Sequence, residues 1–184
     1  MAGRLPEKFY PHRLARADAR FHGTLPLSKM PRLAGVCTDA VADAVVRLDF
    51  GTSEIGLPRL SGTAATEVKI ECQRCLEPMT VQLRANIELA LITPGDEGGR
   101  ERADAGGLEV MEVGEEAIDI ATFIEDELLL AAPDYPMHGE LGEEPCRIDD
   151  EFAPVAEFTE SPFAALGDLL GGTDGPKEPT GNSH

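Results

Sequence analysis

The sequence predicts an α+β fold: an antiparallel sheet or partly closed barrel of about five strands, one main helix packed on it, and a short C-terminal helix. Apolar and polar residues alternate with a period of two between residues 43 and 113, which is typical of half-buried strands. A segment that begins near Asp119 shows helical spacing instead. The composition is 42 % hydrophobic and 5 % aromatic, which indicates an aliphatic core in a chain of 184 residues.

Composition and pattern divide the chain into five parts. Charge, periodicity and the placement of Gly and Pro change at each boundary. The predicted parts are a basic N-terminal arm (1–35), an α+β core domain (36–135) with a mobile loop (94–107), an acidic linker (136–160), a short amphipathic helix (161–171) and a disordered tail (172–184).

Five stretches of the core domain are predicted to be strands. Each is rich in β-branched residues or alternates between apolar and polar side chains. They are "DAVVRLDF", "EIGLPRLSG" with Pro58 marking an edge strand, "TAATEVKIEC", "MTVQLRANIELALI" and "LEVMEV". Cys72 and Cys75 fall in the short connection between the third and fourth stretches, so we expect them at the tip of a β-hairpin.

The main helix is predicted after Asp119, which has the side chain of a helix N-cap. The segment "IATFIEDELLLAAP" follows it with apolar residues at helical spacing, and Pro133 ends the run. Glu125 and Asp126 are expected on the outer and lateral faces of this helix. The preceding stretch, residues 94–107, is polar and rich in glycine, which predicts a mobile loop.

A second amphipathic segment, "SPFAALGDLLGG", lies near the C-terminus. Ser161 is its N-cap, Phe163 and Leu166 begin its apolar face, and Gly171 ends it. A short helix after an acidic linker docks either on its own domain or on a partner, and the sequence leaves both alternatives open.

Charge is distributed unevenly along the chain. Residues 1–35 carry a net charge of +5, whereas the whole chain carries −18. An acidic body repels phosphate, so RNA binding would depend on the basic arm and in particular on Arg13, Arg16 and Arg20. The alternative interpretation of this arm is a frayed and solvated terminus.

Several functional classes find no support in the sequence. It contains no apolar run long enough to span a membrane and no secretory signal, and its four cysteines are too few for a disulfide scaffold, so we expect a cytoplasmic protein with reduced thiols. Motifs of the P-loop, nucleophile-elbow, zinc-protease and dinucleotide-binding types are absent. We therefore expect no enzymatic activity and no small-molecule substrate.

The pair Cys72 and Cys75 admits three interpretations. Two thiolates at a hairpin tip can bind zinc if His138 and Cys146 complete a tetrahedral site. A thiol oxidoreductase is disfavoured, because this pair joins two strands rather than starting a helix, and flanking glutamates raise a thiol pKa. The third interpretation is two packed thiols that bind nothing, so zinc is the one cofactor left open.

Three segments, taken in order, resemble the bacterial YceD family. They are "ECQRCLEPMTVQL", "IDIATFIEDELLLAAPDYPMH" and "SPFAALGDLL", and "PHRLARADARFHGTLPL" fits the same pattern less sharply. The resemblance covers about residues 10–170. It implies a non-enzymatic role in the accumulation of 23S ribosomal RNA and so in biogenesis of the large ribosomal subunit. Some members carry further cysteines after the helix that would complete a zinc site, whereas this chain has only His138 and Cys146 there.

The acidic body suggests how such a role is carried out. Its charge complements a basic large-subunit ribosomal protein or assembly factor better than it complements RNA. We expect that partner to contact Glu125 and Asp126 on the main helix, and Phe163 and Leu166 in the C-terminal segment. Direct binding of precursor ribosomal RNA through the basic arm is the alternative.

Overall fold

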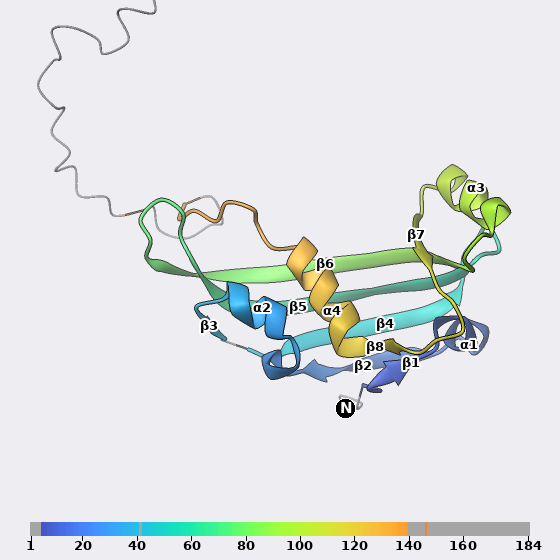
Figure 1. The fold of residues 1–184 in the computed structure, drawn as a ribbon, viewed down its shortest axis with the longest axis horizontal. Helices are drawn as coiled ribbons and strands as arrows, with labels where there is room; N and C mark the ends of the chain where they lie inside the picture. Colours follow the sequence, from blue (N-terminus) through green and yellow to red (C-terminus); the bar gives the residue numbers. More distant parts are fainter. Residues whose placement is uncertain (1–4, 41, 140–145, 147–184) are drawn as a thin grey trace, which may run out of the picture. The chain divides into compact units, whose positions relative to one another are not determined.

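The computed structural model describes residues 5–40, 42–139 and Cys146, and it has an α+β fold built on one open, mixed sheet (Figure 1). The main path of the sheet runs β2–β4–β5–β6–β7, and the short strand β3 pairs beside it with β5. Neighbouring strands are antiparallel except β6 and β7, which are parallel. The bounds are Arg20–Leu25 (β2), Asp39–Ala40 (β3), Ala44–Thr52 (β4), Pro58–Glu71 (β5), Pro78–Ile92 (β6) and Glu109–Glu112 (β7).

A second, two-stranded ribbon and the helices complete the described part. The ribbon pairs β1 with β8 in antiparallel fashion. The bounds are Lys8–Phe9 (β1), Ile118–Asp119 (β8), Pro11–Arg16 (α1), Pro31–Val36 (α2), Glu97–Ala105 (α3) and Ile120–Leu130 (α4), with a 3₁₀ turn at Leu27–Lys29 (η1).

The β5–β6 hairpin is the framework of the sheet. Its strands pair continuously from Arg59–Ala90 to Glu71–Pro78, and the side chains of β6 alternate between buried and exposed as the period of two predicts. The backbones of β4 and β5 come close at Gly62, where a Cβ atom would lie 2.1 Å from the carbonyl oxygen of Arg47. A side chain is therefore excluded at this position.

The helix α4 confirms the main predicted helix. Asp119 caps it by accepting a hydrogen bond from the N–H of Thr122 at 3.0 Å, and the helix ends before Pro133. Phe123, Ile124 and Leu128 are buried in the core. Figure 1 shows α2 and α4 across the same face of the sheet, so the core lies between these helices and the inner side chains of β4, β5 and β6.

The expectation of an antiparallel sheet or partly closed barrel was wrong in one respect, since the sheet is open and mixed. The cause lies in residues 94–107, which were expected to be a mobile loop. Most of this stretch forms α3, whose N-cap Asp96 accepts from the N–H of Gly99 at 2.9 Å. A helical crossover connection carries the chain back to the starting end of β6, so β7 pairs with β6 as a parallel strand.

The helix α3 packs on the opposite face of the sheet from α4. Leu89 belongs to the main core, whereas its neighbour Ala90 packs with Leu57 and Ala103 of α3. Consecutive side chains of a strand point to opposite faces, so the two clusters lie on the two sides of β6.

The N-terminal region is part of the sheet domain rather than a separate arm. Residues 20–25 pair with β4 as an outer strand, and Leu25, Met30 and Leu33 are buried in the core. The boundary expected at residue 35 has no counterpart in the structure, because the apolar side chains of this region fill the space beside α4.

Two further expectations concern strands and the C-terminal region. Pro58 stands at the first residue of β5, where a missing N–H is tolerated, and β5 is a central strand rather than an edge strand. The two strands expected at residues 54–62 and 63–72 form one continuous strand, β5. The amphipathic segment 161–171 and the tail 172–184 lie outside the described residues.

Candidate metal centre

The tip of the β5–β6 hairpin is a tight turn that holds two cysteines. The N–H of Cys72 donates to the carbonyl of Glu77 at 3.0 Å, and the N–H of Leu76 donates to the carbonyl of Cys72 at 2.9 Å. Leu76 adopts a positive φ of 61°, which closes the turn. Cys72 is completely buried, and Cys75 is half-buried.

The segment after α4 brings two more ligands to this turn. It is attached by a hydrogen bond from the N–H of Gln73 to the carbonyl of Pro136 at 2.9 Å. His138 Nδ1 lies 3.3 Å from Cys75 Sγ and 3.8 Å from Cys146 Sγ. Cys146 Sγ lies 3.6 Å from Cys72 Sγ, and all four ligand atoms lie within 4.8 Å of one another.

These distances fit a tetrahedral ion. Ligand atoms placed about 2.3 Å from a central zinc ion in a tetrahedron are separated by about 3.8 Å. Three of the six separations are 3.3, 3.6 and 3.8 Å, close to that value, and all six are at most 4.8 Å. The four residues proposed from the sequence therefore come together as a cluster that could bind a metal ion.

The thiols of the cluster differ in acidity. Burial raises the pKa of Cys72, but donation from the backbone N–H groups of Cys75, His138 and Arg74, and from the Cys146 thiol, outweighs it and lowers the pKa to about 5. Burial and the neighbouring Cys72 and Cys75 sulfurs raise the pKa of Cys146 to about 11. The lowered pKa favours the thiolate form of Cys72, which is the form that binds a cation.

The flanking glutamates do not set the pKa of Cys72, in contrast to the expectation from the sequence. The backbone donors of the turn dominate, and these are visible only in the folded chain. A thiol oxidoreductase nevertheless lacks structural support, because catalytic thiolates are partly exposed and Cys72 has no exposed surface. Cys37 takes no part in the cluster, and burial raises the pKa of its thiol.

Glu125 lies inside the protein, not on the outer face expected for it. Only 3 % of its surface is exposed. Its carboxylate accepts hydrogen bonds from the N–H groups of Arg32 at 2.6 Å and Leu33 at 3.1 Å, and from the Arg32 side chain at 2.9 Å. Glu125 therefore caps the first turn of α2 and is not available to a partner.

An acidic surface does exist beside it. Asp126 is half exposed and pairs with Arg32 at 2.7 Å. Burial raises the pKa of the next residue, Glu127, and the negative charges of Glu109 on β7 and of Asp126 raise it further. Glu127 was expected on the outer or lateral face of α4, and Glu109 was missed in the sequence because β7 lies beside α4 only in the folded chain.

The three arginines proposed for RNA binding are not equivalent. Arg13 and Arg16 lie in the last turn of α1, and the Arg13 guanidinium lies 5.2 Å from the ring centroid of Tyr10. Arg20 lies on β2 and pairs with Asp49 at 3.2 Å. Tyr10 was not singled out in the sequence, although an aromatic residue beside Arg13 is a signal that could have identified it.

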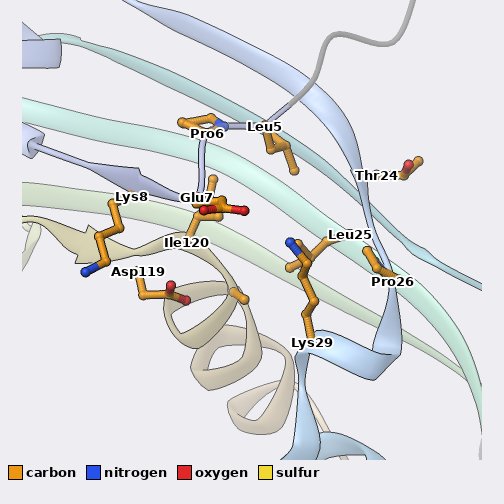
Figure 2. Close-up of a pocket in the computed structure, with 11 residues that line it drawn as sticks. Leu5, Pro6, Glu7, Lys8, Thr24, Leu25, Pro26, Lys29, Asp119 and Ile120 are labelled. Atoms are coloured by element: carbon orange, nitrogen blue, oxygen red, sulfur yellow. The ribbon is translucent and has the colours of Figure 1, made fainter.

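A hollow of about 700 Å³ lies where residues 5–8, the end of β2 and the start of α4 meet (Figure 2). Its rim carries both signs of charge, with Lys8 and Lys29 opposed by Glu7 and Asp119. The Asp119 carboxylate is already engaged as the cap of α4, and the N–H of Thr122 is the main cause of its lowered pKa.

Comparison with known proteins identifies the family. The family described as "Large ribosomal RNA subunit accumulation protein YceD" matches residues 60–170. The chain belongs to the YceD family. A YceD protein of Haemophilus influenzae, "Large ribosomal RNA subunit accumulation protein YceD", is 29 % identical over 172 residues, which cover 90 % of this chain and 96 % of that relative.

No solved structure matches the chain. The YceD match includes the hairpin with Cys72 and Cys75, α4, and both later ligands His138 and Cys146. Within the described part of the chain, no helix is long and apolar enough to cross a membrane.

Proposed function

We propose that this protein is a non-enzymatic biogenesis factor that supports accumulation of the 23S ribosomal RNA of the large subunit. Its membership of the YceD family and the name of the Haemophilus influenzae relative support this role. We further propose that it acts by holding a basic protein, either a large-subunit ribosomal protein or an assembly factor.

The acidic surface of α4 and β7 is the observation that supports a basic protein partner. Glu109 and Asp126 lie close enough to Glu127 for their negative charges to raise its pKa. The whole chain carries a net charge of −18. A Lys- or Arg-rich segment placed there would relieve this repulsion and would bind faster at low salt. Phe163 and Leu166, which lie outside the described residues, stay proposed as a second contact.

A pull-down from cell extract tests the partner. The tagged protein is expected to retain a basic ribosomal protein or assembly factor after RNase treatment, and to lose it as salt rises from about 50 mM to about 200 mM. Glu109→Lys with Glu127→Lys should abolish this retention. Glu97→Lys with Glu101→Lys, on the exposed side of α3, changes the net charge equally and should retain the partner.

Two results would contradict this function. Recovery of RNA alone, lost entirely after RNase, would exclude the protein partner. Depletion of the protein in cells is expected to lower 23S ribosomal RNA while leaving the small-subunit RNA unchanged, so an equal loss of both would contradict a role confined to the large subunit.

We also propose that zinc is the ion of the Cys72, Cys75, His138 and Cys146 cluster. Three sulfurs and one imidazole nitrogen within 4.8 Å of one another are a donor set that zinc prefers, whereas magnesium and calcium prefer oxygen. Bound zinc would join the hairpin tip to the segment after α4. The site is structural in this proposal, since all four positions are taken by protein ligands.

A further inference from the structure

A second hollow, of about 590 Å³, lies between α1 and the loop that follows β7. Its lining combines an aromatic ring, two guanidinium groups and a hydroxyl. The residues that matter to its chemistry are Tyr10, Arg13, Arg16, Thr93 and Glu115. Neither the family match nor the acidic surface described above assigns a role to this hollow.

The positive charges of the two arginines in the hollow are not neutralised by an ion pair with any described residue. Among the described residues, none of the ion pairs involves Arg13 or Arg16. Glu115 is the one acidic residue of the lining, so the hollow carries an excess of positive charge in a chain with a net charge of −18. Such a local excess attracts an anionic ligand against the repulsion of the rest of the molecule.

The aromatic ring stands at the same position. Tyr10 is 44 % exposed, so its ring is accessible to a ligand. The guanidinium of Arg13 lies over this ring, 5.2 Å from its centroid, so the two groups form a cation–π pair. His12 holds the hollow in shape, because its Nε2 donates to the carbonyl of Val113 at 3.2 Å and ties α1 to the opposite wall.

We propose that this hollow binds a nucleotide of single-stranded RNA. The base stacks on the Tyr10–Arg13 pair, and Arg16 binds the phosphate. Stacking on aromatic rings and on arginine planes, together with backbone contacts from arginine, is the usual chemistry of single-stranded RNA recognition. This site goes beyond the proposed function, because a basic protein partner would occupy the acidic surface of α4 and β7 instead.

The outer face of the sheet is the competing surface for RNA. Arg47 on β4 and Arg84 on β6 are exposed there, and no ion pair between described residues involves either of them. Their neighbours on β5 are Thr63 and Ala65, so this face offers charge without an aromatic platform. The hollow at α1 offers both and is therefore the favoured site.

Binding of a fluorescent single-stranded ten-uridine RNA to the full chain tests the charge contribution. Arg13→Gln with Arg16→Gln is expected to weaken binding about ten-fold at about 50 mM salt, and to lower the slope of log affinity against log salt by about 0.7, since the phosphate contact of Arg16 is lost. Arg47→Gln with Arg84→Gln removes the same charge from the sheet face and should bind like the parent.

Substitutions at two further positions test stacking on the Tyr10 ring and the need for open volume in the hollow. Tyr10→Ala should weaken binding about ten-fold through lost stacking, whereas Tyr10→Phe keeps the ring and the affinity. A Cβ atom at Gly114, in the wall of the hollow, would meet no other atom, so Gly114→Leu should fill the hollow without disturbing the fold. Gly35→Leu is the matched control, because Gly35 on α2 is equally unobstructed and lies outside this hollow.

The site is overturned if the parent binds no RNA at about 50 mM salt, where phosphate contacts are strongest. It is equally overturned if the Arg13, Arg16 and Gly114 variants all bind like the parent, or if the Arg47 and Arg84 variant alone loses affinity. Circular dichroism confirms that each variant is folded. None of these outcomes affects retention of a basic protein after RNase, so the two proposals fail separately.

Discussion

At the scale of single residues, Glu125 has the strongest structural role among the acidic side chains of α4. It joins two helices by accepting hydrogen bonds from the first turn of α2, whose N-cap position, Met30, has no side chain that could do so. A carboxylate at a helix N-terminus also interacts favourably with the helix dipole. Burial of this acid is therefore compensated within the fold.

We predict that Glu125→Ala lowers the free energy of unfolding by about 3 kcal/mol, because it leaves the N–H groups of Arg32 and Leu33 without their acceptor. Urea unfolding measures this loss. Asp126→Ala is the control, since it removes only an ion pair between half-exposed side chains and should cost at most about 0.5 kcal/mol. Equal losses in the two variants would contradict the capping role of Glu125.

Asp119 gives a prediction about pH. Its carboxyl pKa is lowered in the folded state, chiefly by the N–H of Thr122. The ionised carboxylate therefore stabilises the folded protein at pH values above the pKa of the unfolded chain. This stabilisation is lost as the pH falls through the lower pKa of the folded state. Asp119→Ala should cost about 1 kcal/mol at pH 7. Asp119→Asn keeps an uncharged cap and should lose less stability than the parent between pH 5 and pH 3. Thermal unfolding across this range checks it, and parallel curves for parent and Asn variant would refute it.

At the scale of elements, the hairpin tip and the segment after α4 depend on each other. The Gln73–Pro136 backbone hydrogen bond and the contacts of the cluster itself join the two. A metal ion held by ligands from both would therefore contribute much of the free energy that holds this end of the sheet together.

We predict that the purified protein contains one zinc ion per chain and that a strong chelator lowers its stability. The expected loss is about 4 kcal/mol when free zinc had been about 1,000 times its dissociation constant. Cys75→Ser should lack zinc and be insensitive to the chelator, whereas Cys37→Ser, outside the cluster, should respond like the parent. Elemental analysis and thermal unfolding measure the two effects, and a metal-free parent with unchanged stability would exclude the proposal.

The crossover helix α3 explains the largest difference between the expected and observed elements. Two adjacent glycines, Gly98 and Gly99, weaken its local helical signal. The cap at Asp96 and the burial of Ala103 against Ala90 and Leu57 compensate for that weakness. The burial of Ala103 needs the sheet to be present, whereas the cap is a local contact that the sequence analysis missed.

At the scale of the whole molecule, net charge sets a general prediction. The chain carries −18, and most of the ion pairs among its described residues join exposed or half-exposed groups that contribute little. We predict that sodium chloride raises the unfolding temperature by a few degrees between about 20 mM and about 500 mM, because it screens the repulsion. Sodium and potassium chloride should act alike in this measurement, and a fall with either salt would contradict the reasoning.

The sequence alone determined the elements whose signal is local. The alternation of β6, the Asp119 cap, the Pro133 stop and the position of Cys72 and Cys75 at a hairpin tip all depend on residues a few positions apart, and the structure confirms them. It also named all four members of the cluster that could bind a metal ion. Their approach to 4.8 Å or less was decided by the fold, which places the segment after α4 on the hairpin tip.

The tertiary structure decided everything that joins distant segments. It made β7 parallel to β6, brought residues 20–25 into the sheet, buried Glu125 beneath α2, and set Tyr10 beside the loop after β7. Periodicity predicts which face of a helix or strand is buried, but it does not predict which element packs on that face. The packing partner depends on contacts between residues that are far apart in the sequence. For this reason the sequence could name the cysteines and histidine of the metal centre, while only the fold separated the acidic surface from the hollow at α1.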